Sequence, residues 1–168
     1  MMLARNKKII AFLAPFLVVM VVEQVSKALV VALMEPGDSV TVIPHFLSIT
    51  YARNTGAAFG LFAGSGQILF WSALVIVVIT LIWFYRTHEQ KSAWCFLALG
   101  LMIGGAAGNL VDRVFRGKVV DFFDLGWWPV FNVADLAIVT GVIMLIVVMI
   151  LEMTRKGSEK RENSEAGG

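Results

Sequence analysis

Residues 104–135 read GGAAGNLVDRVFRGKVVDFFDLGWWPVFNVAD, and this stretch decides the fold because it joins two strongly apolar runs. Its four acidic side chains are Asp112, Asp121, Asp124 and Asp135. A charged group at the centre of a bilayer costs about 2.5–3.5 kcal/mol on insertion scales, so such groups are usually paired or functional. We therefore expect the stretch to bring two aspartates together at a membrane boundary for acid–base chemistry.

The composition of the chain is that of a membrane protein. Of its 168 residues, 58% are hydrophobic and 15% are charged, against roughly 45–50% and about 25% in soluble domains. The net charge of +2 is too small to indicate a nucleic-acid partner. The single cysteine, Cys95, excludes an intramolecular disulfide, and the two histidines, His45 and His88, stand in no metal-binding motif.

Four apolar runs are each close to the 20 or so residues that a membrane helix needs. They cover residues 9–34, 68–85, 93–113 and 133–153. We therefore expect an all-α membrane protein with four transmembrane helices, forming one integral membrane domain over residues 1–153. The charged segment 154–168 has no apolar face, and we expect it to be a disordered cytoplasmic tail.

A different periodicity marks residues 38–62, between the first two expected helices. Leu47, Ile49 and Tyr51 alternate with polar residues, which is typical of a half-buried strand. A small sheet with open edges cannot cross a bilayer, so we expect a β platform on the extracytoplasmic surface. Such a platform is either a plain loop structure or a shelf on which an extended peptide pairs with the sheet edge.

Small residues on one face of the third expected helix would permit close packing against another helix. Gly100, Gly104 and Gly108 repeat every four residues and so share one face, which permits close approach of another helix. Asp112 is the next residue on that face, and Asn109 and Arg113 lie on a neighbouring face. The polar groups should therefore lie at the end of a tightly packed seam.

The first expected helix is interrupted by Glu23 and Lys27, which share a helix face four residues apart. The pair is either an internal ion pair that makes the helix insertable or a support for the active site. A serine–lysine protease dyad is disfavoured, because Ser26 and Lys27 are adjacent and point about 100° apart on a helix.

The distribution of basic residues predicts the topology. In a four-helix arrangement, nine fall on one side: Arg5, Lys7, Lys8, Arg86, Lys91, Arg155, Lys156, Lys160 and Arg161. Four fall on the other: Arg53, Arg113, Arg116 and Lys118. The positive-inside rule then places both termini in the cytoplasm and the aspartate-rich stretch, with the β platform, on the outer side.

Each polar candidate also has a structural explanation. Asp135 would interact favourably with the helix dipole in the first turn of the fourth helix, and Asn132 would cap that helix. Asp112 would balance Arg113, and Asp121 and Asp124 would be solvated loop acids. Two carboxylates that share a site hold one proton between them and can act as acid and base, but the pattern alone does not choose the pair.

Five segments together resemble one family. They are EQVSK at 23–27, NTGAAFG at 54–60, GNLVDR at 108–113, VVDFF at 119–123 and FNVAD at 131–135. In this order and spacing, the chain resembles the bacterial lipoprotein signal peptidases (signal peptidase II), which are four-helix membrane aspartic proteases. The resemblance covers about residues 22–151, with one departure, since the family commonly has aspartate at the position of Glu23.

The resemblance implies the site and the activity. It makes Asp121 and Asp135 the catalytic pair, with supporting or substrate-binding residues Asn54, Gly56, Asn109, Asp112, Arg113, Asn132, Glu23 and Lys27. The implied enzyme needs no metal or cofactor and cuts diacylglyceryl-modified prolipoproteins just before the lipidated cysteine. It is implied to be a bacterial inner-membrane protein acting near the outer leaflet, in contact with membrane lipid, inhibited by globomycin-type peptides and monomeric.

Two other classes of function stay open on the residues alone. Intramembrane acids also serve transporters and proton relays, although four helices with no evident inverted repeat argue against a transporter. A membrane scaffold whose acids are only ion-paired is the second alternative.

Overall fold

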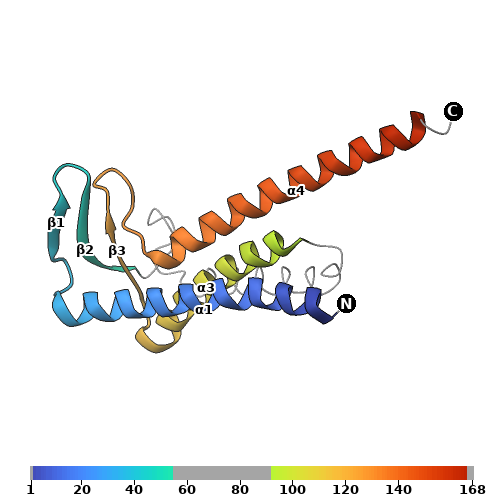
Figure 1. Ribbon diagram of the computed structural model, residues 1–168. Helices are drawn as coiled ribbons and strands as arrows, with labels where there is room; N and C mark the ends of the chain where they lie inside the picture. The colour runs from blue at the N-terminus through green and yellow to red at the C-terminus, as the bar shows by residue number, and fades with distance from the viewer. Residues whose placement is uncertain (1, 55–91, 166–168) are drawn as a thin grey trace.

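The computed structural model describes residues 2–54 and 92–165 of the chain. In this part, three helices, α1 (Met2–Leu33), α3 (Ala93–Arg116) and α4 (Val133–Glu165), carry a small sheet at one end (Figure 1). The sheet consists of β1 (Ser39–Ile43), β2 (Leu47–Asn54) and β3 (Val119–Asp124). The first residues of α1 and the last residues of α4 lie at the other end of the helices from the sheet.

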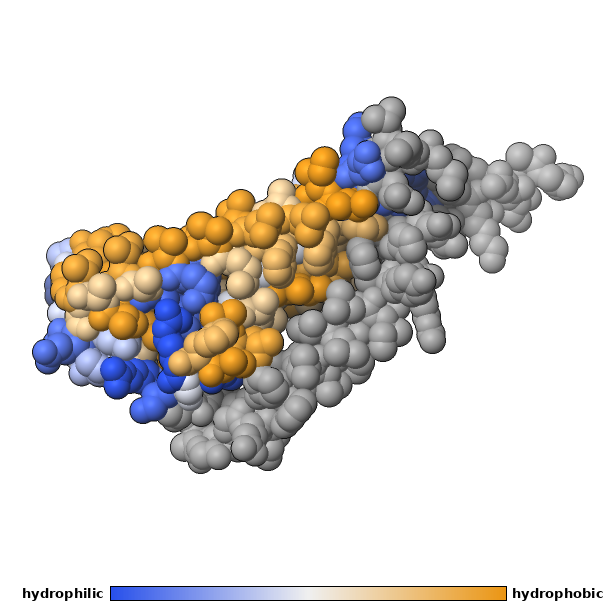
Figure 2. All heavy atoms as spheres, turned by 90° about the horizontal axis from the view of Figure 1, so that it is seen from below, coloured by the Kyte–Doolittle hydropathy of each residue, from blue (hydrophilic) through white to orange (hydrophobic). Residues whose placement is uncertain are grey.

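Each of these three helices is long and apolar enough to cross a membrane. Large apolar side chains cover their outer faces, for example Val21 on α1 and Val139 on α4, which are 60% and 56% exposed. Figure 2 shows hydrophobic residues along the length of the helices, with hydrophilic residues gathered at the sheet end and at the opposite end. This is the surface of a protein whose solvent is lipid over the middle and water at both ends. The helix expected at 68–85 lies outside the described residues.

The glycine seam predicted on α3 is confirmed. A Cβ atom added at Gly100 would lie 2.3 Å from the Phe12 carbonyl oxygen of α1, and one at Gly104 would lie 3.0 Å from the Phe16 carbonyl oxygen. Only glycine therefore permits α1 and α3 to approach this closely. A second seam was not predicted: Gly105 faces the Ala134 carbonyl oxygen of α4, at 2.4 Å from an added Cβ.

The sheet differs from the predicted platform because it has a third strand. Its order is β1-β2-β3, with both pairs antiparallel. The expectation that Asp121 and Asp124 lie in a solvated loop is therefore wrong, since both belong to β3. Residues 119–122 are all buried, so the strand does not alternate apolar with polar residues and lacks the pattern by which strands are recognised. Residues 55–62 of the predicted platform lie outside the described residues.

The helix ends also differ from the expected ones. The start of α1 lies at Met2 rather than residue 9, and α3 ends at Arg116, where Gly117 takes a left-handed conformation (φ 71°). The disordered tail expected from residue 154 is replaced by a continuation of α4 to Glu165. Lys, Arg and Glu are good helix formers, and extending an existing helix needs no new nucleation, so a charged segment continues it.

The seam between α1 and α3 yields a test that does not touch the polar residues. We expect Gly100→Ala to lower the stability by about 1–3 kcal/mol, a typical cost of overpacking, because the added methyl group meets the backbone of Phe12. The thermal unfolding midpoint in detergent measures this. Val114→Ala, at a position 61% exposed on the same helix, is the control. Equal midpoints for the two variants would contradict the close packing of α1 and α3.

Candidate functional site

Asp121 belongs to β3, which places its side chain in the interior of the protein. Val120 and Phe122 pack against Val30 and Tyr51 in a hydrophobic cluster. Side chains alternate along a strand, so Asp121 points to the other face, where it is only 3% exposed. Asn54, on the neighbouring strand β2, donates from Nδ2 to Asp121 Oδ2 at 2.9 Å.

After β3 the chain turns back, so that the start of α4 lies beside this strand. The Phe131 carbonyl oxygen accepts from the Phe122 and Phe123 N–H groups at 2.9 and 2.8 Å, and the Phe131 N–H donates back to the Phe123 carbonyl oxygen at 3.1 Å. Asn132 follows at once and is fully buried. The residues that open α4 therefore lie next to the strand that carries Asp121.

Asn132 and Asp135 cap the helix reciprocally. The Asp135 backbone N–H donates to Asn132 Oδ1 at 3.0 Å, and the Asn132 backbone N–H donates to Asp135 Oδ2 at 3.2 Å. This is the arrangement of a capping box, with aspartate in place of the usual glutamate or glutamine. The predicted cap at Asn132 is thus confirmed, and the cap occupies only one oxygen of Asp135.

Two amide side chains connect the two carboxylates. Asn132 Nδ2 donates to Asp121 Oδ1 at 2.6 Å and to Asn109 Oδ1 at 3.0 Å. Asn109 Nδ2 in turn donates to Asp135 Oδ1 at 3.0 Å. Asp121 and Asp135, 14 positions apart in the sequence, are therefore held by one hydrogen-bonded pair of amides from α3 and the start of α4.

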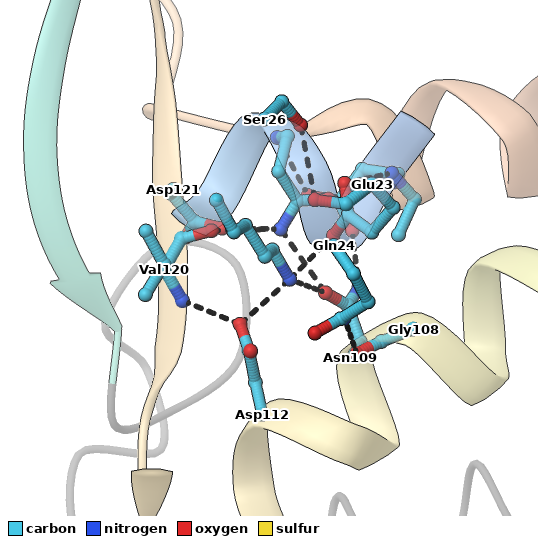
Figure 3. A network of polar contacts seen from close by, with 12 residues as sticks. Glu23, Gln24, Ser26, Gly108, Asn109, Asp112, Val120 and Asp121 are labelled. Atoms are coloured by element: carbon cyan, nitrogen blue, oxygen red, sulfur yellow. Dashed lines mark hydrogen bonds and ion pairs between the residues drawn. The ribbon is translucent and has the colours of Figure 1, made fainter. Parts of the chain in front are cut away.

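A buried cluster of charges lies next to Asn109 (Figure 3). Lys27 and Glu23 form an ion pair, and both side chains are fully buried. Lys27 Nζ also lies 2.7 Å from Asp112 Oδ2 and donates to Asn109 Oδ1 at 3.0 Å. The structure thus shows the internal ion pair, and the contact of Lys27 with Asn109 links this pair to the amides between the two carboxylates.

Glu23 joins this cluster to α4. Its Oε2 accepts from the Ala134 backbone N–H at 3.1 Å, so a carboxylate faces the N-terminus of a helix, where negative charge is favoured. Ser26 Oγ donates to the Glu23 carbonyl oxygen at 3.0 Å. It is engaged with its own helix, as expected if it forms no dyad with Lys27.

The sequence suggested that Asp112 balances the charge of Arg113, but in the structure Asp112 has other partners. It forms ion pairs with Lys27 and Arg116, and its Oδ2 accepts from the Val120 N–H at 2.9 Å, which fixes the turn between α3 and β3. Arg113 instead donates to the Asn109 carbonyl oxygen at 3.2 Å. Sequence reasoning overlooked Arg116, although its spacing of four residues from Asp112 could have indicated the pair.

The environment of Asp121 changes its acidity. Burial raises the pKa of Asp121 from its ordinary value of 3.8 to about 7, and the neighbouring charge of Asp135 adds to the rise. The hydrogen bonds from Asn54 and Asn132 act in the opposite direction. At neutral pH, Asp121 can therefore carry a proton next to a second carboxylate, which is the arrangement that paired acid–base catalysis requires.

Nine of the ten predicted site residues are described and contact at least one other member through the bonds given above. Gly56 lies outside the described residues. Asp124 lies apart: it accepts from Thr50 Oγ1 and from the Gly126 N–H, both at 2.8 Å. Of the four aspartates in the deciding stretch, Asp121 and Asp135 are the two that the amide pair connects.

Known proteins resemble the chain over nearly its whole length. The profile of a family described as signal peptidase (SPase) II matches residues 15–151. Proteins named lipoprotein signal peptidase from Syntrophomonas wolfei and Moorella thermoacetica are 45% and 44% identical to it. The matches cover 86% of this chain and 96% of the first relative, and 88% of this chain and 98% of the second.

Two solved structures share the fold. Both are described as a bacterial membrane enzyme, one at 2.3 Å and one at 1.9 Å resolution. The first is 35% identical with a TM-score of 0.77, covering 85% of this chain and 89% of that one. The second is 36% identical with a TM-score of 0.72, covering 81% of this chain and 90% of that one.

The raised pKa of Asp121 yields a test of stability. Between about pH 3.8 and 7 the folded protein holds a proton on Asp121 that the unfolded chain has lost, so stability falls as the pH rises through this window. Asp121→Asn removes the titration. We expect the stability of the variant relative to the unaltered protein to increase by roughly 2 kcal/mol from pH 5 to pH 8.

Thermal unfolding at the two pH values measures this difference. Val114→Ala, which changes no titratable group at an exposed position of α3, is the control and should run parallel to the unaltered protein. Parallel behaviour of Asp121→Asn would show that Asp121 titrates normally.

Proposed function

The chain belongs to the signal peptidase II family, and from this premise we propose that Asp121 and Asp135 are the two carboxylates with which it cleaves lipoprotein precursors. It is a membrane-embedded protease that removes signal peptides from prolipoproteins. The observation that supports the assignment of the pair is the connection of both carboxylates through the amides of Asn109 and Asn132.

The geometry suggests a division of labour between the two aspartates. Asp135 receives N–H groups from Asn109 and from the Asn132 backbone and stands in the first turn of α4, all of which complement a negative charge. Burial of Asp121 favours its protonated form. Asp135 is therefore the base and Asp121 the acid of the proposed reaction.

The reaction then needs only water and the peptide. Asp135 takes a proton from a water molecule whose oxygen attacks the scissile carbonyl carbon, while Asp121 gives its proton to the carbonyl oxygen. The tetrahedral intermediate collapses when the C–N bond breaks, as Asp135 passes its proton to the leaving nitrogen and Asp121 recovers one from the hydroxyl group. No covalent intermediate, metal or cofactor takes part.

The substrate that we propose is a prolipoprotein whose cysteine already carries diacylglycerol, cut just before that cysteine. Its acyl chains would remain in membrane lipid against the apolar helix faces, since the site adjoins them. The extended peptide would lie along the sheet, where Asn54 of β2 contacts Asp121. Gly56, two residues further on, is proposed as part of the same peptide-binding segment.

The arrangement in the membrane follows from the same features. We propose a single domain over residues 1–153 with four membrane helices, the fourth at 68–85, and both termini in the cytoplasm of a bacterial inner membrane. The ends of α1 and α4 remote from the sheet lie at the same end of the protein, which supports an even number of crossings. The site then faces the outer leaflet, the protein acts as a monomer, and globomycin-type peptides inhibit it.

Cleavage assays on purified full-length protein test the catalytic pair. We expect Asp121→Asn and Asp135→Asn each to lower kcat at least 100-fold, since positioned acids and bases contribute about 10²–10⁴-fold. Each variant should still fold, as judged by circular dichroism. Asp124→Asn should keep near-normal kcat, because Asp124 lies outside the amide-linked pair.

The substrate comparison belongs to the same experiment. A precursor with diacylglyceryl cysteine should be cleaved and the unmodified precursor should not. If either aspartate variant processed the lipidated precursor at a near-normal rate, the assignment of the pair would be wrong, and a scaffold with ion-paired acids would be the better description.

A further inference from the structure

Among the described residues, the buried cation of Lys27 has three oxygen neighbours. Its side chain is fully buried, and its ammonium group contacts Glu23 Oε1, Asp112 Oδ2 and Asn109 Oδ1. The first two contacts are with acidic side chains, either of which alone would balance its charge. The third reaches a neutral amide, and charge balance does not require it.

The contact with Lys27 fixes which end of the Asn109 amide faces the ammonium group. An ammonium group only donates hydrogen bonds, so the amide group of Asn109 that faces Lys27 must be the oxygen. The amide nitrogen then lies on the other side, where it donates to Asp135 Oδ1 at 3.0 Å. The identity of residue 27 as a donor therefore decides which atom of Asn109 the carboxylate of Asp135 meets.

A second donor acts in the same direction. Asn132 Nδ2 also donates to Asn109 Oδ1, at 3.0 Å. The Asn132 side chain cannot turn either, since its own Oδ1 accepts from the Asp135 backbone N–H. A reversed Asn109 amide would bring its NH₂ group against two buried donors and its oxygen against a carboxylate, and unmatched buried polar groups are destabilising.

We propose that Lys27 is a positioning residue for peptide cleavage, which acts by fixing the Asn109 amide so that its N–H group stays on Asp135. The inference rests on the proposed function, because it assigns Asp135 to the reaction. Lys27 does not touch the substrate. Its effect reaches the reaction through Asn109, and loss of that alignment misplaces the base relative to the attacked carbonyl.

The test removes the donor without leaving an unpaired charge. Glu23→Gln combined with Lys27→Met deletes one positive and one negative group and leaves the Asp112–Arg116 pair intact. We expect kcat to fall about tenfold to 100-fold, the range that small misplacements of catalytic groups produce, while KM for the lipidated precursor stays within about twofold. Ser26→Ala, which removes a neighbouring polar group on the same turn of α1 but keeps the contact of Lys27 with Asn109, is the matched control with near-normal kcat.

A double-mutant cycle separates positioning from general stability. In an Asn109→Ala background, the Glu23→Gln, Lys27→Met change should lower kcat by less than about threefold, because the amide that it aligns is gone. A full, multiplicative loss in that background would overturn the inference. So would near-normal kcat in a folded Glu23→Gln, Lys27→Met protein.

A third variant keeps the test open if the charge-neutral variant does not fold. Asn109→Asp keeps an oxygen toward Lys27 and removes the N–H group from Asp135, so it should reproduce the loss of kcat at unchanged KM. Normal kcat for Asn109→Asp would contradict the inference. Failure of the catalytic pair itself is recognised separately, because Asp121→Asn and Asp135→Asn would then still cleave.

Discussion

A buried ammonium group ties the separate parts of this protein together. Lys27 of α1 meets Asp112 and Asn109 of α3, and its partner Glu23 reaches the N-terminus of α4. Two acids and two bases, counting Arg116, leave no net charge in the cluster. In a chain whose outer surface meets lipid, an unpaired buried charge has a high free-energy cost. Removal of one partner would leave such an uncompensated charge. The mutual pairing is therefore what allows three apolar helices to converge on a polar centre.

Close helix packing and the polar cluster depend on each other. An added Cβ at Gly108 would lie 2.9 Å from the Glu23 side chain, so glycine at this position leaves the space that Glu23 fills. The same absence of side chains brings the helix backbones near enough to exclude lipid from the cluster. Beyond the seam, the chain leaves α3 through Gly117 and enters β3, with the Asp112 side chain holding the Val120 N–H across the turn. Ordinary packing and turn chemistry thus set the position of Asp121.

Local patterns in the sequence predicted the parts of this structure that depend on neighbouring residues. The glycine seam, the Glu23–Lys27 pair and the Asn132 cap follow from spacings of three or four residues, and the structure confirms each of them. The third strand and the true partners of Asp112 were not predicted, because a strand buried on both faces shows no alternation and Asp112 meets Lys27 from a distant segment. The choice of Asp121 with Asp135 came from resemblance to a family, since each acid taken alone had an adequate structural explanation.

The structural explanation that the structure confirms for Asp135, a place in the cap of α4, is compatible with a role in chemistry. Asp135 uses Oδ2 in the helix cap and presents Oδ1 to Asn109, so the cap that stabilises α4 also fixes the orientation of a carboxylate. At Asp121, in contrast, the feature that would serve the reaction lowers the stability of the protein. Burial raises its pKa to about 7, and holding an acid in a place that disfavours its charge lowers the stability of the protein at neutral pH. An asparagine there would avoid that cost but could not donate a proton. The requirements of folding alone therefore do not explain why an aspartate is buried here, whereas the acid role that we propose for Asp121 does.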